Sequence, residues 1–219
     1  MSRSAQPSQS SQPNSQPGKN NPEKAATILA GALEVFTAQG YAAASMEKIA
    51  KAAGVSKPTL YKYFRDKEGL FSALVQQLTE RNQEMLPRLL AQSAEHMPPQ
   101  KVLKQIATFA IDDFPRDEAV VRLMRMIIGE SERFPELAQT FVREIEKPLL
   151  ETFAAYFAQQ PQLQLGDPMV AARVFVGAIT HYLIIQKILQ GSEILPLERD
   201  RMIDGLIQII TAKDSTVNG

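Results

Sequence analysis

Apolar residues along this chain recur mostly at every third or fourth position, which is the spacing of one face of an α-helix. The first stripe predicts a helix over about residues 22 to 39, and its apolar members are Ile28, Leu29, Ala32, Val35 and Phe36. Pro22 suits the first turn of this helix, and Gly40 can end it. No run alternates in the manner of a half-buried strand, so the pattern predicts an all-α protein.

Two short helices are predicted to follow, joined by a tight turn. The first carries apolar residues at helical spacing, at Met46, Ile49, Ala50 and Ala53. Ser45 suits its N-cap, Gly54 can adopt the positive φ that stops it, and Ser56 can cap the next helix. Two short helices joined by a glycine-containing turn make a helix-turn-helix, whose second helix enters the DNA major groove.

The second of these helices has one apolar side and one polar side. Leu60 and Phe64, four residues apart, can anchor it to a core. Basic, hydroxyl and aromatic side chains on the other side suit phosphate and base-edge contacts. The candidate DNA-binding residues are Ser45, Lys57, Pro58, Thr59, Tyr61, Lys62, Tyr63 and Lys67. Base readout is expected from Thr59, Tyr61 and Lys62, and phosphate positioning from Ser45, Lys57, Tyr63 and Lys67.

The run GYAAASMEKIAKAAGVSKPTLYKYFRDKEGLF resembles the DNA-binding signature of the tetracycline-repressor (TetR) family of bacterial transcriptional regulators. The likeness rests on the glycine-aromatic end of the first helix, the IA…AGVS turn, the LYxYF recognition helix and the DKExLF that follows. It covers roughly residues 24 to 74, with one departure at Ala44, where family members often carry a hydroxyl residue. The run MRMIIGESERFPELAQTFVREIEKPLLETF is more loosely similar to the C-terminal domain of an AcrR-like subset.

This resemblance implies an N-terminal three-helix helix-turn-helix DNA-binding domain, joined by a long fourth helix to a helical-bundle domain for effector binding and dimerisation. We expect a disordered Ser/Gln/Pro-rich tail over residues 1–22, the DNA-binding domain over 23–66 and the second domain over 67–219. Asp66 suits the N-cap of the fourth helix, which should run from Lys67 toward Ala94 with a kink or break at Pro87.

Five more helices are predicted in the second domain, at about residues 100 to 114, 116 to 133, 135 to 158, 168 to 190 and 197 to 212. Pro148 should bend the third of them. The last two are apolar around most of their circumference, and pairing two copies into an isologous four-helix interface would cover both sides. A monomer that buries both helices is the alternative. The expected interface residues are Val174, Ala178, His181, Tyr182, Ile185, Met202, Leu206 and Ile209.

The 219-residue chain has no formal net charge, but its charges are unevenly distributed. Residues 1 to 67 hold nine basic and four acidic side chains, whereas the remainder holds 15 basic and 20 acidic ones. A basic N-terminal third is expected where that end meets a polyanion, with chance segregation of solvated charge as the alternative. The chain has no cysteine, which excludes thiol catalysis and cysteine-ligated metals. We recognise no signal peptide and no apolar run of membrane-spanning length, so a cytoplasmic protein without a membrane partner is expected.

The sequence offers no catalytic constellation and implies no cofactor or metal. Its two histidines, His96 and His181, are far apart and lack a second histidine at metal-ligand spacing. The middle helices are rich in aromatic residues and methionine, most of which should simply pack the core. In the resembled family, however, these helices enclose an apolar effector pocket, for which such side chains are suited. The candidate pocket residues are Phe109, Met124, Ile128, Phe141 and Phe153.

We therefore expect a ligand-responsive DNA-binding transcriptional regulator. It would act as a repressor that binds a palindromic double-stranded operator as a homodimer and is released by a small, apolar effector. The alternative is a ligand-binding or protein-interaction helical module whose helix-turn-helix does not act on DNA. A helical-bundle enzyme is a third hypothesis, which lacks a catalytic constellation in the sequence.

Overall fold

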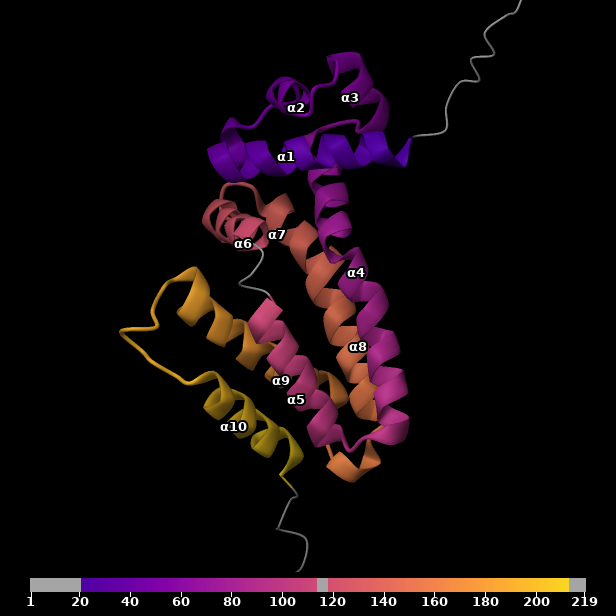
Figure 1. Cartoon of the computed structure of the whole chain (residues 1–219), viewed down its shortest axis with the longest axis vertical. Coiled ribbons are helices and arrows are strands. Elements are labelled where there is room, and N and C mark those ends of the chain that lie inside the picture. The colour runs from indigo at the N-terminus through magenta and orange to yellow at the C-terminus, as the bar shows by residue number, and fades with distance from the viewer. Residues whose placement is uncertain (1–20, 114–117, 213–219) are drawn as a thin grey trace, which may run out of the picture.

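The computed structural model describes residues 21–113 and 118–212, so nearly all of the predicted tail lies outside the described residues. Within these ranges every regular element is helical, which confirms the all-α prediction (Figure 1). The elements are α1 (Pro22–Ala43), α2 (Met46–Ala52), α3 (Lys57–Tyr63), α4 (Lys67–His96), α5 (Pro99–Asp113), α6 (Glu118–Glu130), α7 (Pro135–Phe141), η2 (Val142–Glu146), α8 (Lys147–Ala158), η3 (Pro161–Leu163), α9 (Pro168–Leu183), η4 (Ile184–Ile188) and α10 (Arg199–Thr211).

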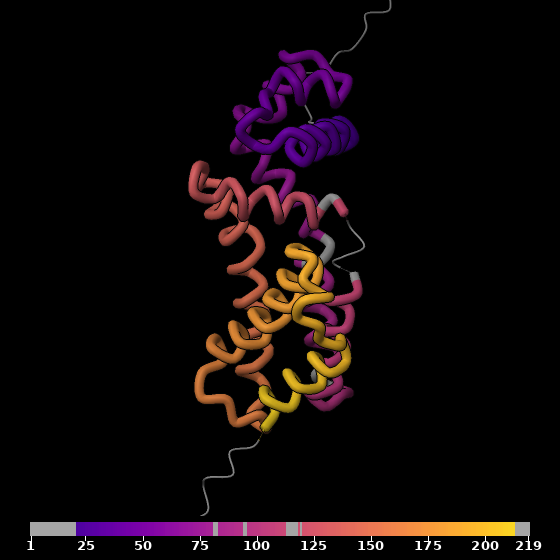
Figure 2. Tube along the Cα trace, turned by 90° about the vertical axis from the view of Figure 1, so that its left-hand side faces the viewer, coloured from indigo at the N-terminus to yellow at the C-terminus, as the bar shows by residue number. Residues whose placement is uncertain are grey.

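The helices form an elongated molecule with the helix-turn-helix at one end. Helices α1, α2 and α3 lie at the top of Figure 1, and α4 descends from them along the body beside α8. Helices α6 and α7 lie directly beneath α1, while α5, α9 and α10 form the lower part. Figure 2 shows the molecule from the side on which α9 and α10 lie. Any tilt of α4 relative to the body would therefore carry the helix-turn-helix with it.

The predicted N-caps all form. The Ser45 hydroxyl accepts from the Lys48 N–H at 3.3 Å, and the Ser56 hydroxyl accepts from the Thr59 N–H at 3.2 Å. Asp66 caps α4 by accepting from the Gly69 N–H at 2.8 Å. These bonds satisfy N–H groups that have no partner within a helix.

Two glycines set the breaks between the first helices. Gly40 has φ 77° and ψ 164°, so the helix breaks at the residue where it was predicted to end. One short helical segment follows this break, as far as Ala43. Gly54 has φ 63°, which turns the chain from α2 toward α3. A side chain at either position would be strained in the left-handed region.

Two separate apolar cores hold the molecule together. The upper core is built from Ile28, Leu29, Ala32, Val35, Phe36, Tyr41, Ala44, Met46, Ile49, Ala50, Ala53, Leu60, Leu70, Phe71, Leu74, Val75, Leu123, Ile127 and Leu137. It thus joins the three DNA-binding helices to the start of α4 and to α6 and α7. The lower core is formed by the end of α4 with α5, α8, α9 and α10. The upper core continues across the predicted division between residues 66 and 67, and that division stays a prediction.

The two prolines inside predicted helices are accommodated in different ways. The helix predicted over 135–158 forms as α7, η2 and α8, with the wider π-helical turn η2 directly before Pro148. Proline has no backbone N–H to donate to a helical hydrogen bond. The N–H of Lys147, the residue before Pro148, donates to Val142 O, which lies five residues back and not the four of an α-helix. The sequence allowed either a kink or a break at Pro87. Helix α4 runs through this proline to His96, so it does not break there.

One expectation about apolar runs is wrong. The segment Pro168–Ile188, which comprises α9 and η4, has the length and a mean hydropathy of 1.6 that would allow a helix to cross a membrane. Its apolar residues lie on more than one side, and one side packs into the lower core at Ala172, Phe175 and Ile179. The sequence pattern missed this run because Arg173, His181 and Lys187 interrupt it.

Gly31 of α1 lies against Ala53, the C-cap of α2, and this contact is testable. A β-carbon at position 31 would lie 2.7 Å from the backbone nitrogen of Ala53. We expect Gly31→Ala to lower the free energy of unfolding by about 1–3 kcal/mol in urea denaturation, because one helix must shift. Gly129→Ala in α6 is the matched control, since a β-carbon there meets nothing within 4 Å. Equal stability of the two variants would contradict the close approach.

Candidate nucleic-acid interface

Helix α3 presents a polar face while its apolar side is fixed in the upper core. Leu60 is fully buried, and Phe64 packs against the same core. On the other side Lys57, Pro58 and Lys62 are exposed, and Tyr61 is 46% exposed. The helix stands at the top of the molecule in Figure 1, away from the body. Its outer face is therefore accessible to a large ligand.

Two of the candidate side chains already make bonds within the chain. The hydroxyls of Thr59 and Ser56 lie 2.7 Å apart, and the Tyr63 hydroxyl accepts from the Asn21 N–H at 3.2 Å. The Tyr63 bond fastens the end of α3 to the start of α1. Both residues are partly buried, and each hydroxyl keeps further hydrogen-bonding capacity.

The basic side chains of α3 are weakly paired. Lys57 Nζ lies 3.9 Å from a carboxylate oxygen of Glu47, and both side chains are mostly exposed. An exposed pair at this distance contributes little and can exchange for another anion. Within the described ranges no carboxylate forms an ion pair with Lys62. Arg65, which the sequence interpretation left out, is also exposed and follows α3 directly.

The position where the sequence departs from the family pattern is buried. Ala44 is 5% exposed and belongs to the upper core, so a methyl group suits it. Ser45 beside it is exposed and caps α2. Lys48 donates to Gln39 Oε1 at 2.8 Å and to Ala43 O at 2.9 Å, which gives this lysine a structural role at the end of α1.

Lys67 is turned inward at the junction of the upper helices. Its ammonium donates to Tyr41 O at 2.8 Å and to Ala44 O at 3.2 Å. It also lies 4.1 Å from the centroid of the Tyr41 ring and 5.8 Å from that of Phe134. Loss of solvent lowers the pKa of Lys67, and the negative charges of Glu130 and Glu136 oppose that shift. The lysine expected to clamp a phosphate thus fastens the end of α1 to the starts of α4 and α7.

Four aromatic rings surround this junction. The Tyr41 ring lies 5.4 Å from Phe36, 5.7 Å from Phe71 and 5.2 Å from Phe134 between centroids. Burial raises the pKa of Tyr41, and its hydroxyl is buried without a hydrogen-bond partner among the described residues. Phe134 is the N-cap residue of α7, so this cluster ties the body to the DNA-binding helices through ring contacts.

The five candidate pocket residues do not surround one cavity. Phe153 is buried in the lower core, whereas Met124 and Phe141 pack against the upper core. Phe109 and Ile128 are exposed. The sequence placed them together because all five are apolar residues of the middle helices. Periodicity does not tell which core each helix faces.

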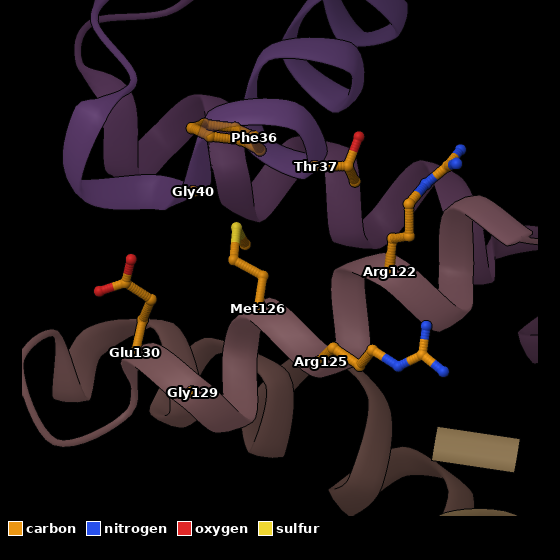
Figure 3. A pocket seen from close by; sticks show the side chains of 8 residues that line it. All are labelled: Phe36, Thr37, Gly40, Arg122, Arg125, Met126, Gly129 and Glu130. Carbon is orange, nitrogen blue, oxygen red and sulfur yellow. The ribbon is translucent and has the colours of Figure 1, made fainter. Parts of the chain in front are cut away.

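An open groove runs instead between α1 and α6. It has a volume of about 430 Å³ and is lined by Phe36, Thr37, Gly40, Arg122, Arg125, Met126, Gly129 and Glu130. Figure 3 shows Met126 pointing toward Phe36 across the groove, with the two arginines at one end and Glu130 at the other. A second opening of about 440 Å³ continues along the same helices. No group of three or more metal-ligating side chains occurs in the part of the chain that the structure describes.

The candidate interface residues divide between the core and the surface. Tyr182 and Leu206 are buried in the lower core, while Ala178, Ile185 and Met202 are partly buried. Val174, His181 and Ile209 are exposed. Exposed Val170 lies one turn before Val174 on α9. Val170 and Val174 are thus uncovered apolar side chains of α9, and Ile209 is one of α10.

Two families match the chain in sequence. Residues 28–74 match the family described as bacterial regulatory proteins, tetR family. Residues 101–213, about half of the chain, match the family described as AefR-like transcriptional repressor, C-terminal domain. Both matches agree with the resemblance drawn from the sequence, and the second extends it over the body.

Several relatives and solved structures are similar to the chain. It is 22% identical to the HTH-type transcriptional regulator YvkB of Bacillus subtilis over 81% of this chain and 89% of that protein. It is 35% identical to the regulator AcrR of Shigella flexneri over 51% of each chain. A TetR-family regulator from Mesorhizobium loti has a TM-score of 0.73 and 27% identity, covering 89% of this chain and 98% of that one. The flavonoid-responsive regulator FrrA has a TM-score of 0.64 and 26% identity, covering 87% and 96%.

The hydrogen bonds that Lys67 makes within the chain lead to a prediction that distinguishes a structural role of this lysine from direct phosphate binding. We expect Lys67→Met to lower the free energy of unfolding by about 1–3 kcal/mol, because two carbonyls lose a charged donor. DNA affinity should fall for all sequences alike, while the dependence of that affinity on salt stays that of the wild type. Urea denaturation and fluorescence anisotropy across a salt series measure both quantities.

Lys101→Met, which changes an exposed lysine of α5, is the control. A variant of Lys67 with unchanged stability and a shallower salt dependence would show instead that Lys67 binds a phosphate directly.

Proposed function

This chain belongs to the TetR family of bacterial transcriptional regulators, and we propose that it is a repressor that binds a palindromic operator as a homodimer. The observation that carries the proposal is the outer face of α3, where exposed Lys57, Tyr61 and Lys62 stand on a helix anchored by buried Leu60. A helix fixed in this way can enter the major groove without losing its own packing.

The DNA contacts divide by chemistry. Tyr61 and Lys62, with Thr59, are proposed to read base edges, because they lie on the exposed side of α3. Ser45, Lys57 and Tyr63 are proposed to position phosphates, with Pro58 at the start of the helix. Arg65 adds a further cation beside them. Lys67 supports this surface from below through its bonds to Tyr41 and Ala44.

The uncovered faces of α9 and α10 support a homodimer. Val170 and Val174 on α9 and Ile209 on α10 are exposed apolar side chains. Gly177 and Gly205 lie on the same helices with open space where a β-carbon would be. Small residues allow close helix approach, and two copies of a self-complementary face close into a dimer. Such a dimer presents two recognition helices to two half-sites.

Release by an effector would act through the links between the two cores. Arg125 of α6 donates to Ile188 O at 3.1 Å and to Lys187 O at 3.0 Å, so the upper core is bonded to the end of η4. Within the upper half, Gln76 of α4 donates to Glu144 of η2 at 2.8 Å, so η2 is tied to the helix that carries the DNA-binding helices. A ligand that binds better to a body conformation with these elements displaced shifts the population away from the DNA-binding state.

The proposed effector is a small, apolar molecule. The body is rich in methionine and aromatic side chains, which adapt to such ligands. Similarity to a flavonoid-responsive regulator supports a ligand of this class. Mass spectrometry of small molecules that co-purify with the protein would identify it.

The alternative functions are less well supported. The family matches do not favour a module whose helix-turn-helix has lost DNA binding. They point to regulators and not to enzymes. A regulator of this kind acts where the chromosome lies, so we assign it to the cytoplasm with no membrane partner.

DNA binding should depend steeply on salt. If each half of the dimer makes roughly four phosphate contacts, the slope of log affinity against log salt should be about −7. Tyr61→Ala and Lys62→Ala should weaken binding to the operator and also reduce the preference for it over unrelated DNA. Lys101→Ala should change neither quantity. Fluorescence anisotropy with the protein's own upstream region tests this, and binding that does not depend on salt would refute the proposal.

The dimer face is tested by adding charge to it. We expect Val174→Glu and Ile209→Glu each to raise the dimer dissociation constant by about 100-fold or more, because an unpaired carboxylate would be buried in the interface. Analytical ultracentrifugation measures the constant. Val142→Glu changes an exposed valine of η2, away from that face, and should leave it unchanged.

A further inference from the structure

Pro148 deprives a carbonyl of the body of its usual donor. In an α-helix the N–H of residue 148 would donate to the carbonyl of Glu144, four residues before it, and proline has no N–H. The π-helical turn η2 directly precedes this position. The Glu144 carbonyl accepts a hydrogen bond from the Gln83 side chain of α4 instead. A side chain of one helix thus supplies the donor that the proline of another helix lacks.

The Gln83 amide is oriented by its own helix, and a second glutamine supports it. The nitrogen that donates to Glu144 O also donates to Thr79 Oγ1 at 3.3 Å, and an amide nitrogen has two hydrogens for these two bonds. Gln76, two turns before Gln83, donates to the Glu144 carboxylate at 2.8 Å. We call Gln76 and Gln83 the glutamine pair. The pair holds both the backbone and the side chain of one glutamate.

The glutamine pair lies beside an apolar contact that leaves the register of the helices less well defined. Leu78 of α4, and Phe141 and Ile145 on either side of Glu144, pack against the upper core. Apolar contact is non-directional, so it tolerates small sliding of one helix along another. A hydrogen bond weakens steeply as its distance and angle change, and two of them, two turns apart, define one register. The pair thus specifies how α4 lies along η2 and the start of α8.

This register affects the place of the recognition helix. Helix α4 descends from the DNA-binding helices and lies beside α8 in the body (Figure 1). Gln83 lies 16 residues after Lys67, where α4 begins, which is about 24 Å of helix. A change of angle at Gln83 is therefore enlarged at the upper end of α4, from which α3 is held.

We propose that Gln83 is a positioning residue for the recognition helix, which holds α4 in the register that presents α3 to DNA. The proposal rests on the function proposed above and adds a residue that touches no DNA. Gln83 acts through Glu144 O, so a side chain of the same length without an N–H cannot replace it.

The first test is Gln83→Met, which keeps the length and the helix propensity of the side chain and removes its donor. We expect operator affinity in fluorescence anisotropy to fall about 3- to 10-fold, the range that loss of one hydrogen bond gives. Gln77→Met is the matched control, because Gln77 is exposed on the same helix and its side chain bonds to nothing within the described ranges. Unchanged operator affinity in Gln83→Met overturns the proposal.

Pro148→Ala separates positioning from the mere satisfaction of a carbonyl. Alanine restores an N–H at residue 148, which can donate to Glu144 O. We expect Gln83→Met to lower stability in urea denaturation less in the Pro148→Ala background than in the wild type. The double variant should still bind the operator about 3- to 10-fold more weakly than the wild type, because the carbonyl is no longer bonded to α4. Recovery of stability and affinity together would overturn the positioning role.

A measurement without DNA distinguishes this proposal from the proposed function. The chain has no cysteine, so exposed Lys51→Cys in α2 and Gln159→Cys after α8 can carry the only spin labels. Pulsed electron paramagnetic resonance on labelled chains diluted with unlabelled ones measures the distance between the labels. We expect Gln83→Met to broaden this distance distribution and Gln77→Met to leave it unchanged.

The two failures then look different. A wild type that binds no operator, with a distribution that still broadens in Gln83→Met, overturns the proposed function and leaves the positioning of α3 by Gln83 in place. A wild type that binds its operator, with the same distribution in Gln83→Met as in Gln77→Met, overturns the positioning role and leaves the proposed function in place.

Discussion

The ammonium of Lys67 is the contact on which the geometry of the upper half depends. It bonds the carbonyls of Tyr41 and Ala44, which end α1, and it lies over the aromatic rings of Tyr41 and Phe134. The cost of removing the cation from water is offset by these two acceptors and by the ring faces. Because Lys67 begins α4 and Phe134 is the N-cap of α7, one side chain joins α1, the long helix and the body.

The division into two cores explains how the body can influence DNA binding. Helices α6 and α7 bury Leu123, Ile127 and Leu137 with the DNA-binding helices, and not with the rest of the body. The lower core is therefore connected to the DNA-binding helices through α4, through the continuous α7–η2–α8 helix and through Arg125. A rearrangement in the lower core that moves η4 would act on α6, beneath α1, through the hydrogen bonds of Arg125. The groove between α1 and α6 lies within the upper half, with Arg125 among its lining residues.

The proposed two-fold arrangement would add a second level of control. A dimer fixes the distance between two recognition helices, and operator binding tolerates little variation in that distance. In the proposed dimer, the exposed apolar side chains of α9 and α10 would set the orientation of the two subunits. The end of η4, which follows α9 directly, is bonded to α6 through Arg125, so a displacement of η4 would act on α6 beneath α1.

The sequence by itself determined the local structure of the DNA-binding half. The caps at Ser45, Ser56 and Asp66 and the turns at Gly40 and Gly54 are decided by side chains within a few residues, so a linear pattern contains them. The stronger of the two family resemblances lies in the same region, whereas the looser one lies in the body. Helix bounds in the body were also predicted closely, because prolines and apolar spacing mark them.

Only the tertiary structure decided which side of each body helix is covered. Periodicity grouped Val174 with Tyr182, and Ile209 with Leu206, yet folding buries the second of each pair and leaves the first exposed. It also grouped apolar residues of α5, α6 and α8 into one expected pocket, whereas those helices face two different cores. The partners of Lys67 were likewise hidden, since Tyr41 and Ala44 come near it only when α4 packs against the end of α1. Contacts between distant segments depend on how the chain folds back, and no local pattern records that.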